Sequence, residues 1–196
     1  MTSDTPTILL VCTGNVSRSA AAERLLAERL GASVHVGSAG TNAALDRPFD
    51  EKMAHFLPGL DTTDFVTRQL TTELVDEASL ILAMTRAHRA YVLDLVPAAV
   101  RRTFTLLEFA KWVSVATPAE LAGATPGERL TTVLGHIPDL RVRAPRQRSA
   151  PVDVRDPFGR DQATYRAVAR QIYEAVETIA DALEKVPKRA AFDDAF

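Results

Sequence analysis

Residues 7–19 read TILLVCTGNVSRS and carry the clearest structural signal in the sequence. Thr7–Val11 is a short apolar run rich in β-branched residues, which is typical of a strand buried on both faces of a sheet. From Ser19 to Leu30 the leucines recur on one helical face, and Gly31 supplies a stop signal. The sequence therefore predicts a buried strand that passes through a short loop directly into a helix.

The alternation of strand and helix continues along the chain. Further strands are expected at 33–39, 79–84 and 103–107, and further helices at 50–57, 87–95 and 162–185. Strands that are apolar throughout and alternate with helices indicate a parallel sheet covered on both faces. Right-handed crossovers bring the loops after the strands to one edge of the sheet, where ligands bind in such folds. Cys12 lies where the first expected strand passes into its loop and is therefore expected at this edge.

The composition is that of an ordinary globular protein. The chain has 196 residues, of which 46% are hydrophobic and 24% charged, and this fits one domain covering 1–196. A formal net charge of -2 predicts no general attraction to nucleic acid or to anionic membranes. No apolar run reaches the roughly 18 residues of a spanning helix, and the N-terminus lacks the pattern of a secretion signal. With a single cysteine and no internal disulfide, we expect a cytoplasmic protein.

The segment 111–152 departs from the alternation, and we interpret it as an insertion within the single domain. It contains two helix-start signals, Thr117–Glu120 and Thr125–Glu128, each with proline at the first helical position. An arginine- and proline-rich run at 141–151 follows, which we expect to be a loop. Its arginines could attract an acidic substrate, but a solvated loop is the favoured interpretation. The residues interpreted as structural or solvated are Arg141, Arg143, Arg146, Arg148, Trp112, His35, His55, His88 and His136.

The loop at 12–19 has the composition of an anion-binding site. Backbone N–H groups between a strand and a helix point inward and, with the positive end of the helix dipole, hold a tetrahedral dianion. Gly14 and Asn15 tolerate the left-handed backbone that a loop with inward-pointing N–H groups needs. The guanidinium of Arg18 can clasp two phosphate oxygens. Cys12 is then either a buried small hydrophobe or a thiolate nucleophile, and these neighbours favour the nucleophile.

Residues 12–19, Cys-Thr-Gly-Asn-Val-Ser-Arg-Ser, resemble the signature of the low-molecular-weight protein tyrosine phosphatases, Cys-x-Gly-Asn-x-Cys-Arg-Ser. Segments 38–41, 67–70 and 80–84 are similar to this family as well. The resemblance implies a three-layer α/β/α fold with a four-stranded parallel sheet, a phosphate-binding loop after the first strand, and hydrolysis without metal or cofactor. It implies that Cys12 is the nucleophile, which becomes a phosphocysteine, and that Arg18 clamps the phosphate. The other phosphate-binding residues that it implies are Thr13, Gly14, Asn15, Val16, Ser17 and Ser19.

Asp156-Pro157-Phe158-Gly159, just before the last expected helix, resembles the mobile acid loop of the same family. A carboxylic acid that protonates a leaving alkoxide or phenoxide contributes about 10² to 10⁴ in rate. The resemblance implies that Asp156 is this general acid and that Phe158 lines a wall of the substrate slot. Asp153 is the rival acid, but it lacks the proline and the aromatic residue that follow Asp156.

The favoured function is a phosphatase acting on a phosphotyrosine protein. Another phosphomonoester or phosphoarginine is the alternative, and relatives acting on phosphoarginine carry threonine at the position of Val16. A silent phosphate-binding module would need neither thiolate nor acid, and a thioredoxin-coupled arsenate reductase would need more cysteines. Departures from the family pattern at Ala44, Phe65 and Ser79 concern substrate positioning, and Ser17 stands where a second cysteine is usual. The oligomeric state stays open.

Overall fold

The computed structural model describes residues 5–145 and 151–184. In this part of the chain the strands are β1 (Thr7–Cys12), β2 (His35–Gly40), β3 (Leu80–Ala83) and β4 (Thr103–Thr105). All of their pairings are parallel, and the order in the sheet is β2-β1-β3-β4. The predicted four-stranded parallel sheet is confirmed.

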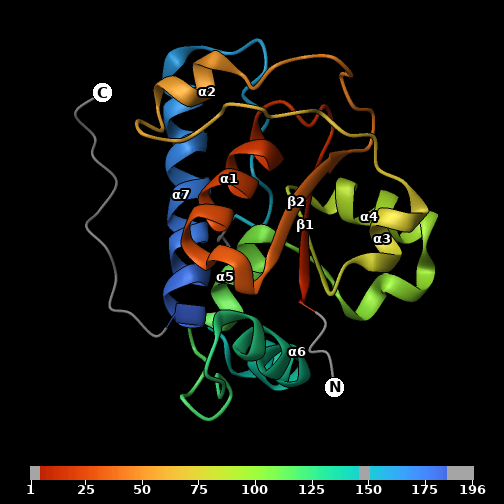
Figure 1. The fold of residues 1–196 in the computed structure, drawn as a ribbon, viewed down its shortest axis with the longest axis vertical. Helices are drawn as coiled ribbons and strands as arrows, with labels where there is room; N and C mark the ends of the chain where they lie inside the picture. The colour runs from red at the N-terminus through yellow and green to blue at the C-terminus, as the bar shows by residue number, and fades with distance from the viewer. Residues whose placement is uncertain (1–4, 146–150, 185–196) are drawn as a thin grey trace.

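Helices cover both faces of this sheet. They are α1 (Arg18–Leu30), α2 (Glu51–His55), α3 (Thr72–Glu77), α4 (Arg86–Leu95), α5 (Leu106–Val113), α6 (Pro126–Arg143) and α7 (Gln162–Glu184). Figure 1 shows α1, α5 and α7 on one side of β1 and β2, and α3 and α4 on the other. The fold is therefore the expected three-layer α/β/α arrangement. None of the described helices is both long and apolar enough to cross a membrane.

Strand β1 lies in the middle of the core. Ile8 and Leu10 point into the apolar cluster formed with α1, α5, α6 and α7, while Leu9 and Val11 point into the cluster with α3 and α4. All four side chains are at most 2% exposed. Full burial of each such side chain stabilises the fold by about 1.5–3 kcal/mol. The rigid position of β1 fixes the start of the loop that follows Cys12.

Helix α6, which lies in the segment expected to be an insertion, packs at the amino edge of the sheet, away from Cys12. Gly127 in the first turn of α6 lies so close to the chain that an added Cβ would be 2.2 Å from the Ser33 carbonyl oxygen and 3.2 Å from Pro6. Pro6 precedes β1 and Ser33 precedes β2, so α6 begins where these strands begin, as Figure 1 also shows. Helix α6 contributes buried residues to the same cluster as α1 and α7: Leu130, Val133, Ile137 and Leu140.

Some expected element boundaries were wrong. The fourth strand ends at Thr105, because Thr105 and Glu108 form a capping box that begins α5. The second strand begins at His35, because Gly31–Ser33 forms a 3-10 turn. Helix α3 was not predicted, although its N-cap Thr71 accepts a hydrogen bond from the backbone of Leu74. The expected last residue of the final helix, at position 185, lies outside the described residues.

The expected loop at 141–151 was also partly wrong, because residues 141–143 form the last turn of α6. Arg143 pairs with Glu120 at 2.6 Å, and the guanidinium of Arg141 lies 5.1 Å from the ring centre of the buried Trp112. Thr117 and Glu120 bond to each other but give only a turn, whereas Thr125 caps α6 as expected. The two remaining arginines of the cluster, Arg146 and Arg148, lie outside the described residues.

Candidate active site

Cys12 ends β1 at the carboxyl edge of the sheet, and its side chain contacts the loop that follows. The residue is only 2% exposed. Its Sγ lies 3.0 Å from the Ser19 hydroxyl oxygen, and the backbone N–H of Asn15 donates to it at 3.3 Å. The sulfur is therefore held between a helix-start hydroxyl and an inward-pointing amide, as the sequence predicted for the loop at 12–19.

The side chain of Asn15 holds the loop at 12–19 in place through hydrogen bonds. It is fully buried, and its backbone has a positive φ of 56°. Its Nδ2 donates to Ser19 at 3.1 Å and to Ser38 at 2.6 Å, and its Oδ1 accepts from the backbone N–H of Arg68 at 2.7 Å. Ser38 in turn donates to Glu23, whose pKa is raised chiefly by burial. Asn15, which was predicted to tolerate the left-handed backbone in the loop at 12–19, is thus also the main side-chain anchor of that loop.

The end of β2 supports the same loop from the side. An added Cβ on Gly40 would be 2.4 Å from the Thr13 carbonyl oxygen and 3.1 Å from the Asn15 nitrogen. Only glycine allows this close approach. The residues that follow donate backbone hydrogen bonds to the loop carbonyls of Cys12, Thr13 and Gly14, at 2.9–3.0 Å, from Thr41, Asn42 and Ala44. The loop is therefore shaped by β1 and β2 together.

Arg18 and Asp156 meet beside the loop although they are distant in sequence. The guanidinium of Arg18, which is 5% exposed, lies 2.7 Å from Asp156 Oδ2 and donates to the Val154 carbonyl at 3.4 Å. The Asp156 side chain is 55% exposed, and its Oδ1 accepts from the backbone N–H of Phe158. The Phe158 side chain itself is largely exposed. The structure thus brings the three expected catalytic residues to one edge of the sheet.

The rival acid, Asp153, is engaged elsewhere. Its Oδ2 lies 2.9 Å from Nη2 of Arg86, and its Oδ1 accepts from the Arg86 backbone N–H. Burial would raise the pKa of Asp153, but the hydrogen bonds and charge of Arg86 outweigh burial and lower it. Asp153 is therefore tied to Arg86 in the first turn of α4, whereas Asp156 contacts Arg18 of the loop at 12–19, so the geometry favours Asp156.

One histidine interpreted as structural or solvated contacts the loop instead. His88 lies in the first turn of α4, with Nε2 2.9 Å from the Thr13 hydroxyl oxygen and Nδ1 2.9 Å from that of Thr85. Burial, together with the charge of Arg18, lowers its pKa to about 4. The available signal was its position three residues after a helix-start threonine that follows a buried strand.

The three residues at which the sequence departs from the family pattern, Phe65, Ser79 and Ala44, make packing or hydrogen-bond contacts with neighbouring segments. Phe65 packs edge-on against Phe49, with ring centres 5.7 Å apart, and the guanidinium of Arg24 lies over it. Ser79 accepts a hydrogen bond from the Thr7 backbone, where β1 begins. Ala44 bonds to the phosphate loop through its backbone, so its small side chain does not weaken this support.

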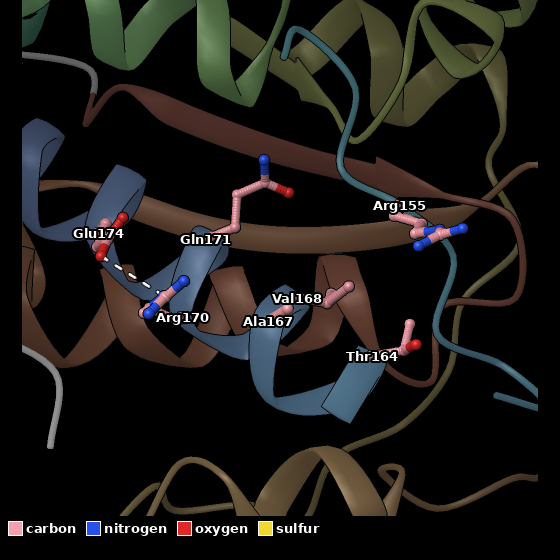
Figure 2. Close-up of a pocket in the computed structure, with 7 residues that line it drawn as sticks. All are labelled: Arg155, Thr164, Ala167, Val168, Arg170, Gln171 and Glu174. Carbon is pink, nitrogen blue, oxygen red and sulfur yellow. Dashed lines mark ion pairs between the residues drawn. The ribbon is translucent and has the colours of Figure 1, made fainter. Parts of the chain in front are cut away.

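A separate hollow lies along α7. It has a volume of about 320 Å³ and is lined by Arg155 and by one face of α7, from Thr164 to Glu174, as Figure 2 shows. Arg170 in its wall pairs with Glu174 at 4.0 Å. Neither Cys12 nor Arg18 reaches this hollow. Among residues 5–145 and 151–184, no three histidine, cysteine or acidic side chains are grouped as metal ligands would be.

The chain is similar to known phosphatases over most of its length. The family described as low molecular weight phosphotyrosine protein phosphatase matches residues 7–121. The low molecular weight protein-tyrosine-phosphatase Etp of Escherichia coli K12 is 39% identical over 108 residues, covering 54% of this chain and 70% of that protein. A protein-arginine-phosphatase of Geobacillus stearothermophilus is 28% identical over 179 residues, covering 90% of this chain and 95% of that protein.

The solved structures agree with these sequence matches. The YwlE arginine phosphatase from Geobacillus stearothermophilus aligns with a TM-score of 0.67 and 26% identity, over 92% of this chain and 94% of that one. Residues 7–121 are more than half of the 196 residues and include the loop at 12–19. The chain therefore belongs to the family of low molecular weight phosphotyrosine protein phosphatases, which are phosphomonoester hydrolases.

Proposed function

We propose that this phosphatase acts on phosphotyrosine in proteins, with Cys12 as nucleophile, Arg18 as phosphate clamp and Asp156 as general acid. The observation that carries the proposal is the meeting of these side chains at one loop. Cys12 Sγ is held by the Asn15 amide, and Arg18 pairs with Asp156 at 2.7 Å. Binding alone would need neither the thiolate nor the acid, so the arrangement favours catalysis over a silent phosphate-binding module.

In the first step the substrate phosphate occupies the loop, where N–H groups and the start of α1 face it. Arg18 exchanges Asp156 for two phosphate oxygens, which frees the carboxyl group. The Cys12 thiolate uses an electron pair to form the S–P bond while the P–O ester bond breaks. Asp156, which takes up a proton from solvent once it is released from Arg18, gives this proton to the leaving phenolate oxygen, and the products are tyrosine and phosphocysteine.

In the second step water attacks the phosphocysteine. Asp156, now ionised, accepts a proton from this water, the P–S bond breaks, and inorganic phosphate leaves. The departing electron pair stays on Cys12 Sγ, and the Ser19 hydroxyl at 3.0 Å is placed to donate to it. Backbone groups of the other loop residues bind the phosphate in both steps: Thr13, Gly14, Asn15, Val16 and Ser17.

Substrate choice is assigned to Val16 and Phe158. A branched apolar residue at position 16 and an exposed aromatic ring after the acid fit a flat phosphotyrosine ring. Phosphoarginine is the second candidate, because the relative named a protein-arginine-phosphatase matches nearly the whole chain. Val16→Thr should then raise the relative rate on phosphoarginine, since a hydroxyl can hydrogen-bond the guanidinium.

The test is a substrate panel of phosphotyrosine, phosphoserine and phosphoarginine peptides beside p-nitrophenyl phosphate. We expect the highest kcat/KM on the phosphotyrosine peptide, and a phosphoarginine preference would overturn the substrate assignment. Cys12→Ser should remove turnover while vanadate still binds. Substantial hydrolysis by the pure Cys12→Ser protein would refute the nucleophile.

We also propose that 1–196 form one domain that acts in the cytoplasm, with the insertion at 111–152 as part of that domain. The buried face of α6 in the same apolar cluster as α1 and α7 supports the single domain. A lone free cysteine that must stay reduced to act as nucleophile supports a reducing compartment.

A further inference from the structure

His88 is a buried side chain that touches the phosphate loop and has no part in the chemistry proposed above. It is 8% exposed and lies in the first turn of α4. Its ring spans the gap between Thr85, the N-cap of α4, and Thr13, the residue directly after Cys12, with both ring nitrogens 2.9 Å from a hydroxyl oxygen. Thr13 is itself an exposed residue of the loop at 12–19.

Two arrangements of the protons fit the two contacts of the His88 ring. The Thr85 hydroxyl oxygen already accepts the backbone N–H of His88 at 3.2 Å, and its own proton can point to Nδ1. The ring proton then lies on Nε2 and is donated to the Thr13 oxygen, which leaves the Thr13 proton free. In the opposite tautomer Thr13 gives its proton to Nε2 and presents only lone pairs outward.

We propose that His88 is a positioning residue: a bound phosphate selects the Nε2–H tautomer of His88, which turns the Thr13 hydroxyl proton toward the phosphate oxygens. An anion attracts the donor and is repelled by lone pairs, so the two tautomers differ in how well they bind it. The proposal rests on the proposed function, because it requires a phosphate in the loop at 12–19. It adds a side-chain donor to the backbone donors of that loop.

The environment of His88 keeps its ring neutral, and a choice between the two tautomers requires a neutral ring. Burial and the positive charge of Arg18 lower its pKa to about 4, although the charges of Asp156 and Asp153 act in the opposite sense. At neutral pH the ring therefore carries a single proton, which can occupy only one of the two nitrogens.

The tautomer is measured by ring ¹⁵N NMR of protein labelled at histidine, free and with inorganic phosphate or vanadate. His88→Gln identifies the His88 signals by their disappearance. We expect the proton on Nε2 when vanadate is bound. A proton on Nδ1 of His88 in the vanadate complex would overturn the proposal, and this result does not depend on turnover.

Kinetics on p-nitrophenyl phosphate test whether His88 acts through Thr13. Thr13→Val and His88→Leu should each lower kcat/KM by about tenfold to a hundredfold, as expected for a hydrogen bond to a charged group. The double variant should be no slower than Thr13→Val alone. His88→Gln, which keeps an N–H donor near the position of Nε2, should recover much of the loss. His35→Leu, at the exposed start of β2, is the control and should not differ from wild type.

Losses that multiply in the double variant would show that His88 acts independently of Thr13 and would overturn the proposal. If His88→Leu fails to fold, the proposal is still tested by the tautomer measurement and by the comparison of His88→Gln with Thr13→Val. Absence of turnover in the wild type would instead refute the proposed function, so the two failures are distinguishable.

Discussion

Asn15→Gly should weaken both the fold and catalysis, because the Asn15 side chain joins three segments of the chain. It accepts from the Arg68 backbone at 2.7 Å and donates to Ser38 at 2.6 Å and to Ser19 at 3.1 Å. Glycine adopts the φ of 56° at this position without strain, so this variant removes hydrogen bonds and leaves the backbone free to keep its shape. Asn15→Ala removes the same bonds and adds a Cβ to a left-handed residue.

The three hydrogen bonds contribute unequally. The Arg68 N–H loses its acceptor, which costs about 1–3 kcal/mol. Ser38 and Ser19 keep other partners, Glu23 and Cys12, so losing Asn15 costs them less. The greater freedom of glycine in the unfolded chain adds about 0.4–1 kcal/mol. For alanine, left-handed strain of about 1–2 kcal/mol takes the place of that entropy.

Urea unfolding measures the first effect and steady-state kinetics the second. We expect a lower unfolding midpoint for Asn15→Gly and a still lower one for Asn15→Ala, with both variants folded in the absence of urea because domains have about 5–15 kcal/mol of stability. Without Asn15 the Ser19 hydroxyl keeps its contact with Cys12 but is held less firmly, and we expect kcat to fall about tenfold, which corresponds to about 1.4 kcal/mol. A wild-type midpoint for Asn15→Gly would refute the reasoning.

Three further predictions follow from the site. Asp156→Asn should lower the rate about 10²-fold or more on a poor leaving group and much less on an activated aryl phosphate; equal losses would instead indicate a role in loop position. Peroxide should inactivate the enzyme with little recovery in dithiothreitol, because Ser17 cannot trap the sulfenic acid of Cys12 as a disulfide. Ser17→Cys should restore recovery, and the buried Ser17 hydroxyl has no hydrogen bond to lose; full recovery of the wild type would contradict this. Stability should fall as the pH is lowered from 6.5 to about 4, because the unfolded chain binds a proton that folded His88, with its pKa of about 4, does not. Between pH 7 and pH 5 the urea midpoint of His88→Gln should fall less than that of the wild type. An equal fall in both proteins would argue against His88 as the source of the pH dependence.

The fold and the centre of the site could be predicted because their signals are local. An apolar strand, a glycine-containing loop and a helix occupy one continuous stretch, and Asp156 is followed directly by a proline and an aromatic residue. The contact between His88 and Thr13 could not be predicted, because it depends on how β3 and α4 lie beside β1. The boundary at Thr105 was predictable from its capping box with Glu108, but the apolar residues between them were interpreted as strand.

The close approach of Gly40 to the phosphate loop has a consequence for the order of folding. Cys12 pairs with Gly40 across β1 and β2, Asn15 holds the Arg68 backbone, and Ile8 pairs with Leu80. These contacts join residues far apart in the chain, and closing such long loops is slow compared with forming a helix. Helix α1 can therefore form early, whereas Cys12 acquires its surroundings only when the strands are in register. Recovery of activity during refolding thus reports a late event, the completion of the sheet.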